Sequence, residues 1–348
     1  MNIKVKRIFR GLLDKYPRID ATQYCFRHSK KIEYRLKVLE KDSMIMQCTT
    51  LGKLNPDKNI YFIEFGDSCD GFFAEYRKVL DYLYYADRFS FIPVIKFTED
   101  FIYSEKHPIN GSDNPFEYYF EQPSGITVEE ANHSYNVFKC TEAQVGLVEH
   151  DKERRDGYAL NNEYFSRLAT LSRKYIRLNK VVKQQIEEDI NTILMKKKVI
   201  GVHVRGTDFN RGFKGHPTIV TPNRHLSEVK GLLETGLYES VFLATDDVNV
   251  IKQFEKELGD KVCYYKDVLR SEDDVSVAFK QSTRENHHYK LGLEVLRDMM
   301  TLASCDALVA GISQVSICAM ITKRSWKQEY LGCQILDNGI NQSGKIYS

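Results

Sequence analysis

Polar side chains follow three apolar, strand-like segments in the second half of the chain. A planar guanidinium matches phosphate oxygens, a carboxylate accepts hydrogen bonds from a ribose diol or a guanine edge, and the start of a helix favours an anion. Together these groups are suited to binding a nucleoside diphosphate. The segments and their polar residues are 199–204 with His203 and Arg205, 240–245 with Asp246 and Asp247, and 307–312 with Ser313 and Gln314.

Each of these groups also has an ordinary structural interpretation. An arginine after a strand often forms a surface ion pair, and a Thr-Asp-Asp or Ser-Gln sequence often caps a helix. No single group therefore distinguishes a binding site from local structure. Their occurrence together in one domain favours the nucleotide site.

Several common cofactor and metal motifs are absent from the sequence. No G-x-G occurs, so the dinucleotide fingerprint is missing. The segment 201–207 spaces its glycines like a P-loop but lacks the lysine that would follow. No D-x-D with two aspartates occurs either, a motif that would supply a divalent ion to a nucleotide diphosphate. We therefore expect neither a cofactor nor a metal, with the nucleotide acting as a substrate.

The second half of the chain alternates between strand and helix patterns. This alternation predicts a doubly wound parallel sheet. In such a sheet, ligands bind in the crevice beyond the carboxyl ends of the strands, where the polar residues above are placed. The predicted strands are 199–204, 240–247, 261–268 and 307–313, and the predicted helices are 225–236, 248–259 and 287–305.

A strand, a helix and a second strand are also predicted in the first half, at 59–66, 72–87 and 90–97. This spacing is typical of a βαβ unit with a parallel pair of strands. Residues 98–160 are polar and aromatic without regular periodicity, and serve either as a lid or acceptor surface or as an ordinary insertion. The apolar face of the helix is predicted to contain Phe72, Tyr76, Val79, Leu80 and Leu83.

Two helical patterns, 162–178 and 181–198, separate these halves. The length of 348 residues suggests two domains. We place their boundary in or just after the second helix, which gives an N-terminal domain at 1–190 and a C-terminal domain at 191–348.

Charge and hydropathy limit the partners and the compartment. Fifty Lys and Arg residues against 48 Asp and Glu residues give a net charge of +2, which argues against a nucleic-acid partner. The basic N-terminus lacks the apolar run of a secretory signal and suits either a membrane surface or a solvated helix face. The eight cysteines form no C-x-x-C and are expected to be reduced thiols. We expect a cytoplasmic protein, either free or in peripheral contact with the inner face of the membrane.

Three motifs resemble those of the GDP-fucose-dependent fucosyltransferases, and most closely those of the α1,6-fucosyltransferases of the core and Nod-factor type. They are H-V-R-G-T-D at 203–208, V-F-L-A-T-D-D at 241–247, and the run from Asp298 to Ser313, Gln314 and Val315. The resemblance covers mainly residues 198–348. It implies an α/β fold of the GT-B type, in which two Rossmann-like domains face each other and the C-terminal one holds the donor.

The resemblance also implies roles for individual residues in an inverting, metal-independent reaction. The motif-one arginine, here Arg205, would bind the β-phosphate and stabilise the departing GDP, with His203 nearby. Asp298 and the region of Asp246 and Asp247 would hold guanine and ribose. Residues implied to contact the phosphates or sugar, or to cover the donor, are Ser313, Gln314, Val315 and Arg284.

The sequence departs from the family at the residues expected to act as catalyst. The second arginine of motif one is Gly206 here, and the position of the presumed catalytic Glu holds Phe213. A general base is expected because the attacking hydroxyl must lose its proton. The catalytic candidates are Asp208 and Glu75, with Asp67, Asp70 and His216 as further alternatives.

These observations predict a glycosyltransferase that moves fucose from GDP-fucose to a glycan hydroxyl. The acceptor is expected to be an oligosaccharide or a lipid-linked glycan in surface polysaccharide synthesis. Two alternatives stay open at this point. One is a GT-B transferase that uses another nucleotide sugar, and the other is a non-catalytic nucleotide- or sugar-binding protein.

Overall fold

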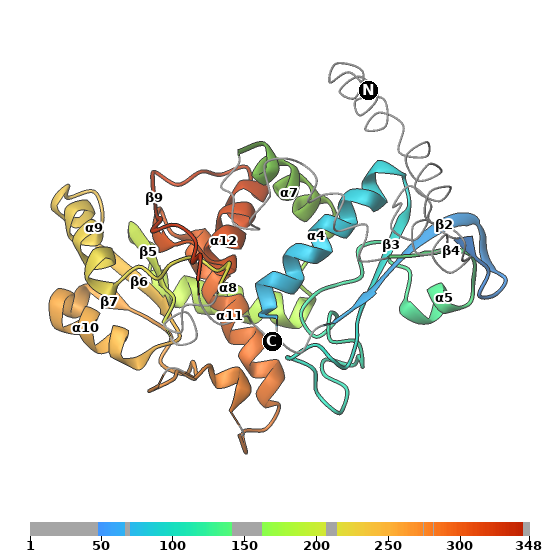
Figure 1. Ribbon diagram of the computed structural model, residues 1–348, viewed down its shortest axis with the longest axis horizontal. Helices are drawn as coiled ribbons and strands as arrows, with labels where there is room; N and C mark the ends of the chain where they lie inside the picture. Colours follow the sequence, from blue (N-terminus) through green and yellow to red (C-terminus); the bar gives the residue numbers. More distant parts are fainter. Residues whose placement is uncertain are drawn as a thin grey trace, which may run out of the picture.

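The computed structural model describes residues 48–66, 70–140, 162–206, 214–273, 275–280 and 282–343. In this part of the chain, two β-sheets lie on either side of a central group of helices (Figure 1). One sheet is built from the first half of the chain and the other from the second half. The protein is thus a mixed α/β structure with largely parallel sheets, as the alternation of strand and helix patterns predicts.

The first sheet contains the predicted βαβ unit. Its elements are β1 (Cys48–Thr49), β2 (Leu54–Phe65), α4 (Phe72–Arg88), β3 (Ile92–Phe97), α5 (Val128–Asn132) and β4 (Ser134–Lys139). The strand order is β1-β4-β2-β3, and β2 pairs in parallel with both β3 and β4. The parallel pair joined by α4 is therefore confirmed. β4 lies inside the segment for which the sequence predicted no regular element.

The second sheet is parallel throughout its described strands and doubly wound. Its elements are β5 (Val199–Val204), α9 (Pro222–Glu234), β6 (Ser240–Thr245), α10 (Val248–Leu258), β7 (Val262–Cys263), α11 (His287–Ser304), β8 (Ala307–Gly311), α12 (Gln314–Ser325) and β9 (Gly332–Leu336). The strand order is β7-β6-β5-β8-β9, so the chain adds β6 and β7 on one side of β5 and then β8 and β9 on the other side. This reversal is a topological switch point, where open α/β sheets bind their ligands.

Helices cover both faces of the second sheet because successive side chains of a strand point to opposite faces. Val202 belongs to an apolar cluster with side chains of α9 and α10, whereas Val199 belongs to the cluster that contains α11 and α12. Gly201 lies directly under α11. An added Cβ there would sit 3.1 Å from side-chain atoms of Leu302 and Cys305. α11 can therefore pack close to β5, next to the switch point.

A single apolar cluster connects the two sheets. It includes Tyr61 and Ile95 of the first sheet and Phe242 and Leu308 of the second. The helices α7 (Asn162–Tyr175) and α8 (Lys180–Leu194) contribute to the same cluster from between the two halves. The predicted division into domains at 190/191 stays a prediction, and the apolar core extends across it.

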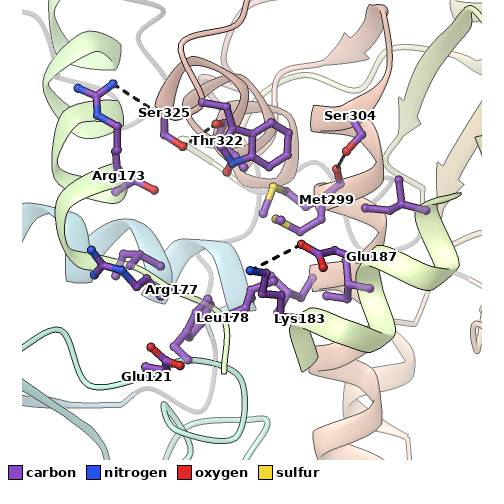
Figure 2. A pocket seen from close by; sticks show the side chains of 18 of the residues that line it. Glu121, Arg173, Arg177, Leu178, Lys183, Glu187, Met299, Ser304, Thr322 and Ser325 are labelled. Carbon is purple, nitrogen blue, oxygen red and sulfur yellow. Dashed lines mark hydrogen bonds and ion pairs between the residues drawn. The ribbon is translucent and has the colours of Figure 1, made fainter. Parts of the chain in front are cut away.

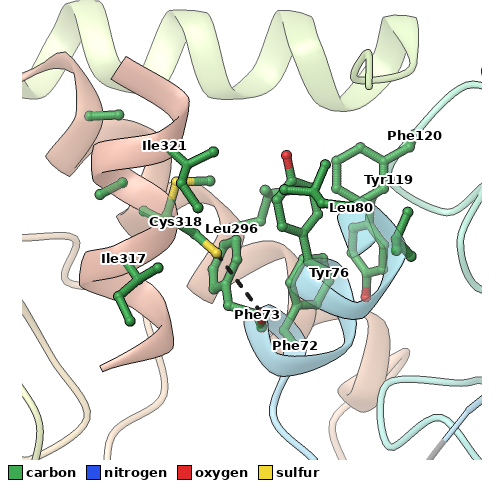
Figure 3. Packing of buried hydrophobic residues seen from close by; sticks show 14 of the residues in the cluster. Phe72, Phe73, Tyr76, Leu80, Tyr119, Phe120, Leu296, Ile317, Cys318 and Ile321 are labelled. Carbon is green, nitrogen blue, oxygen red and sulfur yellow. Dashed lines mark hydrogen bonds between the residues drawn. The ribbon is translucent and has the colours of Figure 1, made fainter. Parts of the chain in front are cut away.

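Contacts between α4, α11 and α12 form the centre of this cluster (Figure 3). Phe73, Leu296 and Ile321 are buried together, and the Cys318 Sγ lies 3.9 Å from the Phe73 carbonyl oxygen. Among the described helices, none is both long enough and apolar enough to cross a membrane.

Two helical glycines provide a matched test of this packing. A Cβ at Gly292 of α11 would overlap with the Tyr119 hydroxyl, which donates a 3.0 Å hydrogen bond to the Tyr289 carbonyl. We expect Gly292→Ala to lower the free energy of unfolding by roughly 1–3 kcal/mol through overpacking. A Cβ added at Gly231 of α9 would meet no atom within 4 Å, so Gly231→Ala should raise it by about 0.5–1 kcal/mol through helix propensity. Urea unfolding of both variants measures the two changes, and an equal effect at the two sites would contradict the packing described here.

Candidate functional site

Arg205 and Asp246 form an ion pair at the carboxyl ends of β5 and β6. The parallel register places Val204 opposite Thr245, so the next residues of both strands emerge side by side. The Arg205 Nη1 lies 2.8 Å from the Asp246 Oδ2. Asp246 also accepts a 2.8 Å hydrogen bond from the Gly206 N–H through Oδ1. The carboxylate thus fixes both the guanidinium and the backbone that follows it.

The close approach of this backbone explains the glycine at position 206. A Cβ there would lie 2.7 Å from the Asp247 Cβ and 3.2 Å from the Asp246 Oδ1. Any larger residue at position 206 would require Asp247 to move.

His203 lies at the floor of the site as a neutral imidazole. Its side chain is buried, and its Nδ1 lies 3.2 Å from the Ser313 hydroxyl. Burial, followed by the positive charge of Arg205, lowers the pKa of His203 to about 3. At neutral pH it therefore adds no charge and acts through hydrogen bonding and shape.

Two of the predicted ligand-binding residues cap helices. The Ser313 Oγ accepts a 3.1 Å hydrogen bond from the Ser316 N–H, and the Ser316 Oγ accepts one of 3.0 Å from the Ser313 N–H. The Asp247 Oδ1 accepts a 2.7 Å bond from the Asn249 N–H at the start of α10. The ordinary structural interpretation of these residues is thus confirmed. Ser313 in addition orients His203.

Asp298 of α11 is a buried carboxyl group beside these strand ends. Its exposed fraction is 7%, and its Oδ1 has no hydrogen-bond partner among the described residues. Burial raises the pKa of Asp298 to about 7, against the opposing influence of the positive charges of Arg270 and Arg297. A buried carboxyl with a displaced pKa and an unused acceptor atom is characteristic of a functional site.

One pocket brings together five of the predicted substrate-binding residues, namely His203, Arg205, Asp246, Asp298 and Val315. Its volume is about 100 Å³. The remaining lining residues are Tyr103, Ala244, Thr245, Val268, Leu269, Ser276, Val277, Ala278, Leu291, Glu294 and Val295. The pocket lies beyond the carboxyl ends of β5 and β6, next to the switch point, where the doubly wound sheet predicts it.

Arg270 is an important neighbour of this pocket that the sequence analysis missed. Its Nε donates a 3.1 Å hydrogen bond to the Thr245 carbonyl, and its Nη1 donates to the carbonyls of Tyr265 at 2.9 Å and Val268 at 3.1 Å. These bonds hold the loop after β7 against the end of β6. The signal was present, because Arg270 follows a predicted strand just as Arg205 does.

Arg284 and Gln314 lie beside the pocket rather than in its lining. Arg284 forms an ion pair with Glu294 and lines a second cavity of about 810 Å³, which shares Ala278 with the first. The Gln314 Oε1 is buried without a hydrogen-bond partner in the described part of the chain. Both predicted residues are therefore near the site without contributing to its walls.

Of the predicted general bases, those that the structure describes do not line this pocket. Glu75 is fully buried on α4 and lies 3.1 Å from the Lys78 ammonium, which also contacts Asp70 at 2.5 Å. His216 lines neither cavity, and its carbonyl accepts a 2.9 Å bond from the Asn341 N–H. Asp67 and Asp208 lie outside the described residues.

The described side chains contain no group of three or more His, Cys, Asp or Glu residues that could hold a metal ion. Two ion pairs lie at the pocket, Arg205 with Asp246 and Arg284 with Glu294.

No protein-family model and no curated protein matches this chain. Solved structures that resemble it include the NodZ α1,6-fucosyltransferase soaked with GDP-fucose, with 15% identity, a TM-score of 0.46, and coverage of 76% of this chain and 92% of that one. POFUT1 in complex with GDP has 14% identity, a TM-score of 0.48, and coverage of 80% and 99%. The fucosyltransferase NodZ from Bradyrhizobium has 15% identity, a TM-score of 0.45, and coverage of 76% and 92%.

The displaced pKa of Asp298 predicts a pH-dependent stability. Asp298 holds its proton up to about pH 7 in the folded chain and loses it near its ordinary pKa of 3.8 when unfolded. Between these values the folded state binds more protons, so the free energy of unfolding falls as pH rises, by up to ~4 kcal/mol. We expect Asp298→Asn, which cannot ionise, to gain stability relative to the wild type from pH 4 to pH 8. Urea unfolding of both proteins at the two pH values measures this gain, and a constant difference would show that Asp298 is ionised throughout.

Proposed function

We propose that this protein is an inverting, metal-independent glycosyltransferase of the GT-B type that uses GDP-fucose as its donor. The observation that carries the proposal is that Arg205 and Asp298, which are far apart in the sequence, line one pocket at the switch point of a doubly wound sheet. A guanidinium and an unused carboxyl acceptor are the groups required at the two ends of a guanosine diphosphate.

The depth of the two groups suggests the direction of the nucleotide. Asp298 is buried, whereas the Arg205 side chain is 31% exposed and lies nearer to solvent. Ligand-binding pockets usually have about 300–1,000 Å³, so a pocket of about 100 Å³ can enclose only part of a nucleotide. We place the base at Asp298 and the diphosphate at Arg205, with the sugar extending outward.

Guanine is the base whose hydrogen-bonding edge suits Asp298. Its N1–H and N2–H₂ groups are adjacent donors that favour the ionised form of Asp298, and this carboxylate can accept from both. Adenine and cytosine present an acceptor at the corresponding ring nitrogen, which a carboxylate would repel, and uracil offers a single N–H. The buried acceptor therefore supports a guanine nucleotide over the other common nucleotide-sugar donors.

In the proposed reaction, a glycan hydroxyl attacks the anomeric carbon of fucose while the bond to the β-phosphate oxygen breaks. Negative charge then develops on the departing GDP, where the fixed Arg205 guanidinium stabilises it. Asp208 is the proposed acceptor of the hydroxyl proton, since it follows Arg205 by three residues. Glu75 is a weaker candidate because its carboxylate is buried beside Lys78.

We further propose that the acceptor is an oligosaccharide or a lipid-linked glycan, modified in the cytoplasm during surface polysaccharide synthesis.

Nucleotide binding can be tested by thermal unfolding with GDP, GDP-fucose, UDP, CMP and ADP, with and without EDTA. A ligand that binds the folded state alone stabilises it by about 2.7 kcal/mol at 100 times its Kd. We expect GDP and GDP-fucose to raise Tm, with no effect of EDTA and little shift with the other nucleotides. Arg205→Ala should weaken GDP binding at least about tenfold, because a charge-assisted contact to phosphate is lost.

The control for this experiment is Lys252→Ala, which removes an exposed cation of α10 and should leave the GDP-induced shift unchanged. Stabilisation by UDP alone would show that the donor is a uridine nucleotide sugar and not GDP-fucose. Stabilisation by GDP without release of GDP from GDP-fucose, across a panel of glycan acceptors, would favour a binding protein over an enzyme.

A further inference from the structure

A large apolar cleft lies on the other side of α11 from the nucleotide pocket. It has a volume of about 840 Å³ and is bordered by α7, α8, α11 and α12, as Figure 2 shows. Its floor is formed by buried or half-buried side chains from these helices and from α4. The main apolar contributors are Tyr76, Ile176, Ile186, Leu296, Met299 and Met300.

The spacing of residues on α11 keeps the two cavities separate. Val295 and Asp298 line the nucleotide pocket, while Leu296 and Met299 line the cleft. Residues that differ by one position point about 100° apart around a helix, so α11 forms a wall between the two sites. The cleft is therefore a distinct cavity, and an inference about it does not depend on the proposed nucleotide site.

The mouth of the cleft carries excess positive charge. Arg173, Arg177 and Lys180 line it, and none of them forms an ion pair with any residue that the structure describes. A fourth cation, Lys183, lies 3.9 Å from Glu187. Glu121 is the other lining carboxylate. Figure 2 shows Arg173 and Arg177 on one side of the cleft and Met299 across from them.

We propose that this cleft binds a single-chain amphiphile, with its alkyl chain on the apolar floor and a phosphate head group at the cationic mouth. The volume lies within the range of ligand-binding pockets, which combine apolar walls with a few placed polar groups. Met299 and Met300 are unbranched and flexible, so they can adapt to a chain without a fixed shape. Arg173 and Arg177 both line the mouth, and each guanidinium can donate hydrogen bonds to a phosphate oxygen.

An intrinsic tryptophan can report on ligand binding in this cleft by its fluorescence. The chain contains one tryptophan, and Trp326 lines the cleft with 38% of its surface exposed. A chain entering the cleft should bury the indole and shift its emission to shorter wavelength. The experiment titrates the full chain with dodecyl phosphate below its micelle concentration. It uses dodecyltrimethylammonium and butyl phosphate as probes that change the head charge and the chain length separately.

We expect a saturable emission shift with dodecyl phosphate and at least tenfold weaker binding of the other two probes. The double variant Arg173→Glu/Arg177→Glu should also bind dodecyl phosphate at least tenfold more weakly, since both cations at the mouth are reversed. These side chains are exposed, and an unchanged Tm in the absence of any ligand would show that the variant is folded. Lys252→Glu on α10 is the matched charge reversal away from the cleft and should bind like the wild type.

Three results would overturn the proposal. Equal affinity for the cationic probe would mean that the cleft binds detergent without regard to its head group. A shift that begins only at the micelle concentration would mean that no single chain is bound. An emission shift that depends on protein concentration alone would show that a second copy of this chain covers the cleft. GDP binding is unaffected by each of these outcomes, so failure here is distinguishable from failure of the proposed function.

Discussion

The burial of α11 is the constraint on which the arrangement of the molecule depends. Most of its length is buried, including Leu293, Leu296, Met299 and Leu302. It packs against β5, against α4 and α12, and against α8, so its faces serve both halves of the chain. A helix in this position cannot rotate without exposing apolar area on several sides at once, which would lose about 25 cal/mol for each Å². Asp298 is consequently carried into a buried position that a carboxyl group would not adopt by itself.

The second constraint is the parallel register of β5 and β6. It brings Arg205 and Asp246 to adjacent positions, and the ion pair between them fixes the Arg205 guanidinium in the pocket lining. Asp298 lies more deeply buried in the same lining. The positions of the polar groups in the site therefore depend on packing elsewhere in the molecule. Neither the strand register nor the position of α11 is determined by the site residues themselves. This division of roles is typical of α/β proteins, in which a rigid sheet presents loops and strand ends.

The sequence predicted which strand-end residues lie together better than it predicted the elements around them. His203, Arg205 and Asp246 line one pocket as expected, because parallel strands bring their carboxyl ends to one edge, and their binding of a nucleotide stays a prediction. The same reasoning also applies to Arg270, which was overlooked after a strand that is only two residues long in the structure. Glu75 was predicted as a candidate general base, yet it is three residues after Phe72 and four before Val79, so helical periodicity places it on the buried face. β4 was missed because its residues mix polar and aromatic types, Ser134–Lys139, and its pairing with β2 comes from tertiary contact.

The most direct test of the central claim is a crystal structure of the protein with GDP bound. The account predicts that the guanine edge lies within hydrogen-bonding distance of the Asp298 carboxylate and that the β-phosphate contacts the Arg205 guanidinium. The Arg205–Asp246 ion pair would remain as the support of that contact. A nucleotide bound away from the carboxyl ends of β5 and β6, or bound there with its phosphates at Asp298, would contradict the account.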